Sequence, residues 1–248
     1  MAKKARTPRP PVVHAPKRRE TRSGGRSGLG STARWVLVGA GVLVAGVVAA
    51  LALGLTGGGE SASAQVETAM KAAGCTLRAV KPLPPTKTGQ TYHADAPTLT
   101  SKTRWSTSPP SAGGHYDHWA VWGFYRAAVN PRQVVHNLEH GGVAIWWGPK
   151  VPGGTIDRIE TFYRESPNGM IGTPFEGLGN KIVLTAWTGN PQTYYRGDYG
   201  MGHLATCTKF DEDAFAAFRS AFRGKGPEGI PTSSNLPGTG PTTGMPSG

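Results

Sequence analysis

Apolar residues recur at the spacing of an α-helix in three parts of the chain. One pattern predicts a helix over residues 155–165, with an apolar face formed by Ile156, Ile159, Phe162 and Tyr163. A later pattern predicts a helix that begins after Asp211, a favourable N-cap residue, and that carries three phenylalanines on one face: Phe215, Phe218 and Phe222. A third predicts a helix over residues 64–73 that ends at Gly74.

Other segments have the pattern of β-strands. The run KIVLTAW at residues 181–187 predicts a buried strand, and residues 204–209 are expected to pair with it. Asn130-Pro131 predicts the start of a short helix over residues 131–139, which two glycines end before a strand at residues 143–147. Because helices and strands are interleaved irregularly and turn residues are dense, we expect the α+β class.

Composition divides the chain into five regions. Residues 1–34 form a basic, Pro/Gly/Ser-rich tail, residues 35–55 are apolar, and residues 56–64 form a short linker. Residues 65–223 are expected to form a single compact domain, since about 160 residues suffice for a sizeable core. Residues 224–248 are a low-complexity Pro/Gly-rich segment, which we expect to be disordered like the first tail.

Residues 35–55 predict one transmembrane helix, because they hold no charge and 21 residues span roughly 30 Å as a helix. The preceding tail carries ten Lys or Arg and one acid, Glu20, so the positive-inside rule places it in the cytoplasm and the domain outside. The alternative is a signal peptide cleaved after Ala62-Ser63-Ala64. Since the apolar run exceeds a signal core of about 7–15 residues, we expect an uncleaved single-pass anchor in the cell membrane.

The positive charge of the chain is concentrated in that tail. The formal net charge is +12, of which residues 1–34 supply +9 (ten basic residues less one acidic residue). The Trp-rich part of the domain lacks the interleaved basic residues that nucleic-acid binding requires. We therefore expect the membrane, and no nucleic acid, as a partner.

The two cysteines, Cys75 and Cys207, lie near the two ends of the predicted domain. In an extracytoplasmic compartment, such an isolated pair is typical of a disulfide bond. A cysteine-ligated metal is the other option, but these cysteines lack the C-x-x-C spacing that indicates one. We expect the disulfide.

Histidines are concentrated between residues 115 and 140, which hold four of the seven in the chain. His136 and His140 are four residues apart on the predicted short helix, so their imidazoles share a face and could chelate a metal ion. His115, in a Gly-rich loop, would be a third ligand, and Met201 and His203 are possible additional ligands. A set that mixes imidazole with thioether favours copper over zinc.

Other histidines have simpler interpretations. His118 precedes a tryptophan and is expected at the surface or in packing, and His93 is expected in a turn. His136 and His140 could also be core residues that bond to carbonyl groups. The domain would then be a structural or interaction module without metal, whose loop at residues 108–119 docks on a membrane protein partner.

The segment HNLEH at residues 136–140 also fits H-x-x-E-H, the inverted zinc-hydrolase motif, in which Glu139 would act as the general base. That motif needs a long helix and a downstream acidic ligand, whereas two glycines end this helix at once. The sequence has no G-x-S-x-G elbow and no phosphate-binding loop. A binding domain is therefore favoured over an enzyme.

These motifs together resemble the bacterial domain-of-unknown-function family 3105, whose members are membrane-anchored. The resemblance covers about residues 75–223 and is most specific in the SPPSAGGH loop, the WGFY stretch and VHNLEHG. Its motif positions are Pro109, Pro110, Ser111, Gly114, His115, Gly123, Tyr125, His136, Leu138, Glu139, His140 and Gly141. His118 has no counterpart, and Ala112-Gly113 departs from the tighter loop of the family. The resemblance implies an extracytoplasmic domain after an N-terminal anchor and no established activity.

Overall fold

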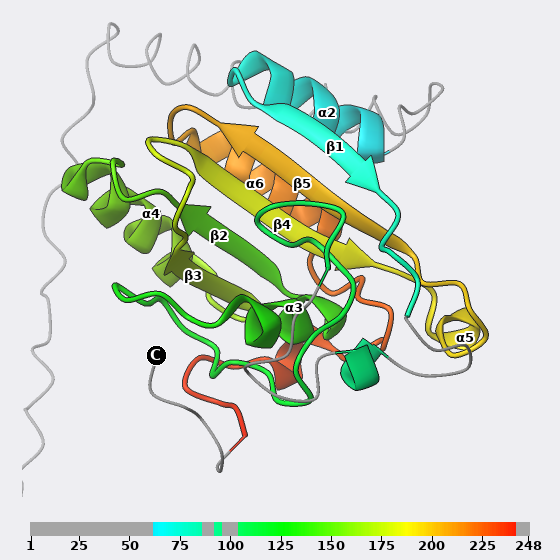
Figure 1. Ribbon diagram of the computed structural model, residues 1–248. Helices are drawn as coiled ribbons and strands as arrows, with labels where there is room; N and C mark the ends of the chain where they lie inside the picture. The colour runs from blue at the N-terminus through cyan, green and yellow to red at the C-terminus, as the bar shows by residue number, and fades with distance from the viewer. Residues whose placement is uncertain (1–61, 86–91, 96–103, 242–248) are drawn as a thin grey trace, which may run out of the picture. The chain divides into compact units, whose positions relative to one another are not determined.

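A five-stranded mixed sheet lies at the centre of the computed structural model, which describes residues 62–85, 92–95 and 104–241 (Figure 1). Its order is β1 (Thr76–Val80), β5 (Met201–Cys207), β4 (Ile182–Thr188), β2 (Val143–Trp147) and β3 (Met170–Pro174). Neighbouring strands are antiparallel except β2 and β3. That parallel pair requires a crossover connection, which α4 (Gly153–Glu165) provides. The expected α+β class is confirmed.

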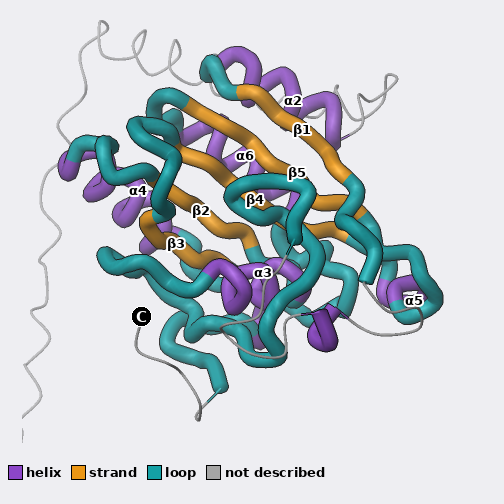
Figure 2. Tube along the Cα trace, in the orientation of Figure 1, coloured by secondary structure: helices purple, strands orange, loops and turns teal. Residues whose placement is uncertain are grey.

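Helices pack on both faces of the sheet (Figure 2). On one face lie α2 (Ala62–Ala72), α4 and α6 (Glu212–Phe222), whose apolar side chains meet those of the strands, among them Met70, Phe162, Phe218, Ile145, Leu184 and Ala205. On the other face lies α3 (Pro131–Glu139), in a second core with Val134, Leu138, Trp146, Val183 and Trp187. Because both faces are covered, β2 is buried at every position.

The short helix predicted over residues 131–139 is confirmed as α3, with the same bounds. Asn130 caps it, since its side-chain oxygen accepts a hydrogen bond from the N–H of Arg132 at 3.0 Å, and Pro131 occupies the first position. Gly141 follows the helix with a φ of 82°, a left-handed conformation that favours glycine. Local signals therefore determine both ends of this helix.

Most other predicted elements are present. Helices α2 and α4 and strand β4 lie within two residues of their predicted bounds, and β2 matches them. Strand β5 begins at Met201 rather than at residue 204, and it pairs with β4 as expected. Besides two short 3₁₀ turns, three elements among the described residues were not predicted: β1, β3 and α5 (Pro191–Tyr194). Each is short, β1 is a partly exposed edge strand with an arginine, and β3 contains a glycine and ends in a proline.

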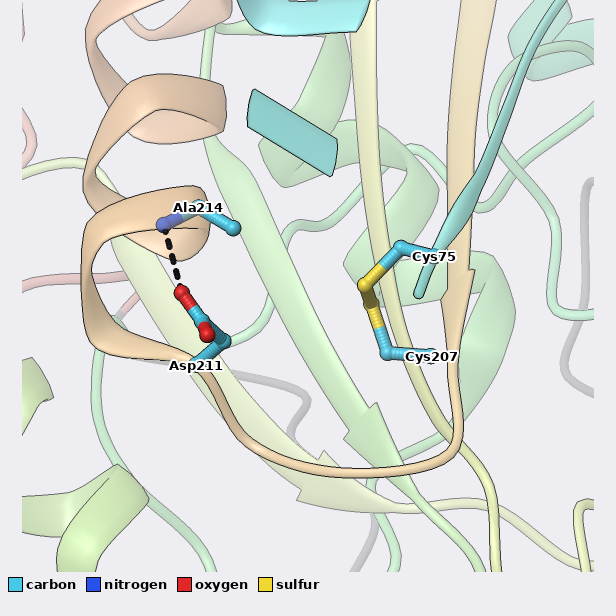
Figure 3. The surroundings of a disulfide bond; sticks show 4 residues. All are labelled: Cys75, Cys207, Asp211 and Ala214. Carbon is cyan, nitrogen blue, oxygen red and sulfur yellow. Dashed lines mark hydrogen bonds between the residues drawn. A yellow bond between two sulfur atoms is a disulfide. The ribbon is translucent and has the colours of Figure 1, made fainter. Parts of the chain in front are cut away.

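Cys75 and Cys207 form the predicted disulfide bond (Figure 3). The bond joins the residue before β1 to the last residue of β5, 132 positions later, and both cysteines belong to the core on the α6 side of the sheet. Figure 3 also shows the predicted cap of α6, where the Asp211 carboxylate accepts a hydrogen bond from the N–H of Ala214 at 3.1 Å. The disulfide thus ties the beginning of the domain to its last strand.

The expectation of disorder after residue 223 is wrong for residues 224–241, which pack against the end of α3. The side chain of Asn235 is buried and donates a hydrogen bond to the carbonyl oxygen of His140 at 2.9 Å. At Gly226 a side chain would not fit, because its Cβ would lie 2.3 Å from the carbonyl oxygen of Glu139. Composition indicated disorder because apolar residues are few, but close backbone packing and amide hydrogen bonds hold this segment instead.

The predicted membrane span at residues 35–55 lies outside the described residues, as do the basic tail and the last seven residues. Within residues 62–85, 92–95 and 104–241, no helix is both long and apolar enough to cross a bilayer. The anchor and the extracytoplasmic location therefore stay predictions.

Candidate functional site

Among the described residues, six ionisable side chains converge at the C-terminal end of α3: His93, His115, His136, Glu139, His140 and Glu228. Three come from α3 and its C-cap, one from the 3₁₀ turn η1 (Tyr92–Asp95), one from the loop before α3 and one from the C-terminal segment. We call these six side chains the histidine cluster. Segments far apart in the sequence therefore build it together.

Helical geometry places the three members that α3 contributes. Residues three and four apart share a face of a helix, so His136 lies beside both Glu139 and His140. The two Nε2 atoms of His136 and His140 are 3.1 Å apart, and His136 Nε2 is 4.0 Å from Oε2 of Glu139. The predicted proximity of His136 and His140 is confirmed.

The first group of possible ligand atoms surrounds Oε2 of Glu139. Nε2 of His115 lies 3.0 Å from this oxygen, Nε2 of His93 lies 3.3 Å from it, and His136 completes the group. The side chains of His115, His136 and Glu139 are buried, whereas that of His93 is 33% exposed. Three imidazole nitrogens and one carboxylate oxygen, all within 4.8 Å of one another, could hold a metal ion.

The ring of His115 is held with Nε2 facing this group. Its Nδ1 lies 2.8 Å from the carbonyl oxygen of Gly113, which can only accept, so Nδ1 carries a proton. In the neutral ring, Nε2 then bears a lone pair. This Nε2 is buried and has no hydrogen-bond partner among the described residues, although Oε2 of Glu139 is 3.0 Å away. Buried polar atoms are rarely left in that state, so this one requires an explanation.

The ring of His136 is oriented in the same way as that of His115. Its Nδ1 lies 2.8 Å from the carbonyl oxygen of Tyr116, which orients the ring and leaves Nε2 toward the cluster. Burial, and then the neighbouring imidazoles of His115 and His140, lower the pKa of His136 to about 2. The imidazole is therefore neutral at ordinary pH, which is the form that binds metals.

Two contacts set the orientation and charge of Glu139. The hydroxyl of Tyr194, the last residue of α5, donates a hydrogen bond to Oε1, which leaves Oε2 for the histidines. Burial alone would raise the pKa of Glu139, but the imidazoles of His115, His93 and His136 around the carboxylate hold this pKa well below its usual value. The hydrogen bond with Glu139 raises the pKa of His93. Glu139 is thus a buried anion among imidazoles.

A second group of possible ligand atoms shares His136 with the first. Nε2 of His140 lies 3.1 Å from Nε2 of His136 and 3.2 Å from Oε2 of Glu228. The hydroxyl of Tyr195 donates a hydrogen bond to Oε1 of Glu228 at 2.6 Å. The hydrogen bond with His140 lowers the pKa of Glu228, so this carboxylate is also an anion.

Aromatic rings enclose the cluster. The centroid of the Trp119 ring lies 4.8 Å from that of His140 and 5.4 Å from that of His136, and the Trp187 ring lies 5.9 Å from that of His115. Apolar neighbours lower the local dielectric constant and so strengthen every electrostatic interaction within the cluster.

Met201 and His203 do not join the cluster, which corrects their prediction as possible ligands. His203 stacks on Phe222 of α6 at a ring distance of 4.0 Å, and its Nε2 is hydrogen-bonded to Oγ1 of Thr188 at 2.8 Å. Since side chains alternate along a strand, Met201 of β5 faces the same side. That side carries α6, whereas α3 lies on the opposite face of the sheet.

Three members of the cluster were not predicted as metal ligands: His93, Glu228, and Glu139, which was considered only as a general base. His93 does lie in a turn, as expected, but its ring also reaches Glu139. Glu228 comes from the segment that was expected to be disordered, where a lone acid carries no recognisable pattern. His118 lies outside the cluster, where it pairs with Asp117 at 2.7 Å.

The geometry does not favour the zinc-hydrolase interpretation of HNLEH. Helix α3 ends at Glu139, and His140 is its C-cap, so the long helix of that motif is absent at these residues. A general base needs a carboxylate oxygen that can reach the attacking water. Here Tyr194 occupies Oε1 of Glu139, while Oε2 faces His93 and His115.

A family model matches the chain over residues 98–234, and its description is protein of unknown function (DUF3105). The match includes the SPPSAGGH loop, α3 and Glu228, and it begins after His93. No curated protein and no solved structure matches the chain. The match spans more than half of the 248 residues and agrees with the resemblance seen in the motifs: the chain belongs to the DUF3105 family of proteins of unknown function.

Proposed function

We propose that this domain binds a divalent transition-metal ion through His115 and Glu139, together with His93 and His136. The observation that carries the proposal is Nε2 of His115, which is buried without a hydrogen bond 3.0 Å from an anionic oxygen. A lone pair and a carboxylate oxygen at that distance repel each other. A cation bound by both removes the repulsion and satisfies the buried nitrogen.

The distances support a first coordination shell. Bonds of about 2.0–2.1 Å in tetrahedral geometry, as zinc forms with imidazole and carboxylate, set the ligand atoms roughly 3.3 Å apart. The distances from Oε2 of Glu139 to Nε2 of His115, His93 and His136 are 3.0, 3.3 and 4.0 Å. The first two distances lie within about 0.3 Å of this value, and the distance to His136 exceeds it by about 0.7 Å.

The groups behind the ligands support the same conclusion. Metal-binding histidines in proteins usually donate their second N–H to a carbonyl or carboxylate group, which fixes the tautomer and the ring orientation. His115 and His136 do so through the carbonyl oxygens of Gly113 and Tyr116, both at 2.8 Å. Tyr194 orients the carboxylate of Glu139 in the same manner.

A proton is the competing explanation for the contact of His115 with Glu139. A second proton on Nε2 would make the pair an imidazolium and a carboxylate. However, the two atoms lack the alignment of a hydrogen bond, which such an ion pair would have. Ligands that share an ion point at the ion rather than at each other, and this accounts for the misalignment.

The donor set determines which ions fit. With Met201 on the far side of the sheet, the predicted preference for copper loses its thioether argument, and nitrogen and oxygen donors suit Cu(II) and Zn(II). Nitrogen and oxygen sites generally bind Cu(II) more tightly than Zn(II). On this proposal the domain handles copper or zinc, with copper bound more tightly.

The proposal includes the place of the domain. Residues 35–55 would anchor it in the cell membrane, with the basic tail in the cytoplasm and the site outside. The disulfide between Cys75 and Cys207 is in keeping with an oxidising compartment. The role would be to hold or pass on metal at the outer side of the membrane.

A titration of the full chain in detergent tests the proposal, with Cu(II) and then Zn(II) as the probe. His115→Ala is compared with His118→Ala, a matched variant whose histidine lies outside the cluster. We expect the wild type and His118→Ala to bind metal alike and His115→Ala to bind at least tenfold more weakly. Equal binding by all three would contradict the proposal. No binding at all, with a lower thermal stability of His136→Ala, would favour the structural module.

A further inference from the structure

We infer that the histidine cluster is a two-ion site, with one ion on His93, His115 and Glu139 and a neighbouring one on His136, His140 and Glu228. The inference rests on the proposed function, because it concerns how many ions the cluster binds. Each ion would have two imidazoles and one carboxylate. The two groups of possible ligands overlap only at His136, so the assignment of that residue decides the count.

His136 can serve one ion only. Its Nδ1 is committed to the carbonyl oxygen of Tyr116, so Nε2 offers a single lone pair. This Nε2 is 3.1 Å from Nε2 of His140 but 4.0 Å from Oε2 of Glu139. The shorter distance favours His136 as a partner of His140. A first ion could use His136 as a fourth ligand, and His136 would move to the second ion when both are bound.

After that assignment, two equivalent sets remain. In the first, His93 and His115 lie 3.3 and 3.0 Å from Oε2 of Glu139. In the second, His140 lies 3.1 Å from the Nε2 atom of His136 and 3.2 Å from Oε2 of Glu228. Each imidazole Nε2 and each Oε2 then binds one ion, and every member of the cluster serves as a ligand.

Two tyrosines orient the carboxylates in the same way, one in each ligand set. Tyr194 donates a hydrogen bond to Oε1 of Glu139, and Tyr195 donates one to Oε1 of Glu228. In both carboxylates, Oε2 is therefore left facing histidine nitrogens. If Glu228 were only a structural partner of His140, nothing would require it to be oriented as Glu139 is.

Charge supports a second cation. Glu139 and Glu228 both belong to the cluster, and each directs Oε2 at imidazole nitrogens. Two nearby carboxylates repel each other in surroundings of low dielectric constant. Two divalent ions remove this repulsion, and each would keep open positions for water beside its three protein ligands.

The test is the number of metal ions bound per chain at saturation, measured on the full protein in detergent after dialysis against a weak chelator. Cu(II) is the probe, and Zn(II) is used in parallel. We expect two ions in the wild type, one in Glu228→Gln, and two in Glu176→Gln, which replaces an exposed glutamate outside the cluster. Neighbouring Cu(II) ions also couple magnetically, so the wild type should give less electron paramagnetic resonance intensity than two isolated ions, and Glu228→Gln the full intensity of one.

Three results would overturn the inference, and they are distinguishable. One ion in the wild type removes the second ion but leaves the proposed function standing. No ion in the wild type removes both. Two ions in Glu228→Gln as well as in the wild type would show that Glu228 is not a ligand. If a variant does not fold, the resonance intensity of the wild type alone still distinguishes two coupled ions from isolated ones.

Discussion

Tyr194 and Glu139 lie 55 residues apart in the sequence, yet the tyrosine hydroxyl donates a hydrogen bond to Oε1 of this glutamate inside the domain. The contact connects α5, which follows β4, to the last turn of α3. It presents the other carboxylate oxygen to His115 and His93. The position of the proposed metal ligand thus depends on a residue that does not itself face the metal.

Tyr194→Phe tests this dependence. Loss of the hydroxyl leaves Oε1 of Glu139 without its donor, so the carboxylate loses its fixed orientation. We expect metal affinity to fall about 10–100-fold, which is the usual effect of removing a group that orients a ligand. Metal titration measures this, and circular dichroism checks that the fold is retained. Unchanged affinity in a folded variant would contradict the orienting role.

Gly226→Ala tests how the C-terminal segment reaches the cluster. The new Cβ would lie 2.2 Å from the nitrogen of Gly141 and 2.3 Å from the carbonyl oxygen of Glu139, so the segment that carries Glu228 must move away. We expect a loss of roughly 1–3 kcal/mol in the free energy of unfolding, as for other overpacked sites, measured by urea denaturation.

Gly154→Ala is the matched control for that variant. Gly154 lies in the first turn of α4, and nothing is within 4 Å of the position its Cβ would take. Since alanine favours helices over glycine, the stability should be unchanged or raised by up to about 1 kcal/mol. Equal losses in both glycine variants would show that the contact at Gly226 is not the cause.

The side chain of His203, which lies outside the cluster, should make the stability of the fold depend on pH in the acid range. Burial, and then the charge of Lys225, lower the pKa of His203 from 6.5 to about 4. The unfolded chain takes up a proton at this residue as the pH falls through 6.5, whereas the folded protein does so only near pH 4. Stability is therefore lost as the pH falls across this window, by an amount on the order of 2–3 kcal/mol.

His203→Gln should remove that part of the acid dependence. Between pH 6.5 and 4, the melting temperature of the metal-free variant should fall less steeply than that of the wild type. Parallel slopes for the wild type and His203→Gln would show that this residue does not titrate as described.

The disulfide should stabilise the fold without affecting metal binding. It closes a loop of 132 residues on the α6 side of the sheet, opposite α3. Cys75→Ser together with Cys207→Ser should lower the free energy of unfolding by about 3–5 kcal/mol. The metal content of the folded double variant should equal that of the wild type. If the folded variant lost metal, metal binding on one face of the sheet would depend on the disulfide on the other face.

Local signals account for what could be predicted from the sequence. Asn130-Pro131 and Gly141 act on neighbouring backbone groups, so the bounds of α3 follow from them, and the spacing of four brings His136 beside His140. The family resemblance likewise rested on contiguous motifs.

Long-range packing accounts for the rest. His93 reaches Glu139 over 46 residues, and Glu228 arrives on a segment that packs closely at Gly226 and forms hydrogen bonds with the end of α3. No periodicity marks such contacts. The error at Met201 and His203 has a similar origin, because the face of β5 that each side chain occupies depends on the register with β4.

The most direct test of the metal proposal is a crystal structure of the protein grown with Cu(II) or Zn(II), with anomalous data collected on both sides of the absorption edge of the metal. The account predicts an anomalous peak between Nε2 of His115 and Oε2 of Glu139, at bonding distance from both. Absence of a peak there, with the two atoms joined by an aligned hydrogen bond, would contradict it.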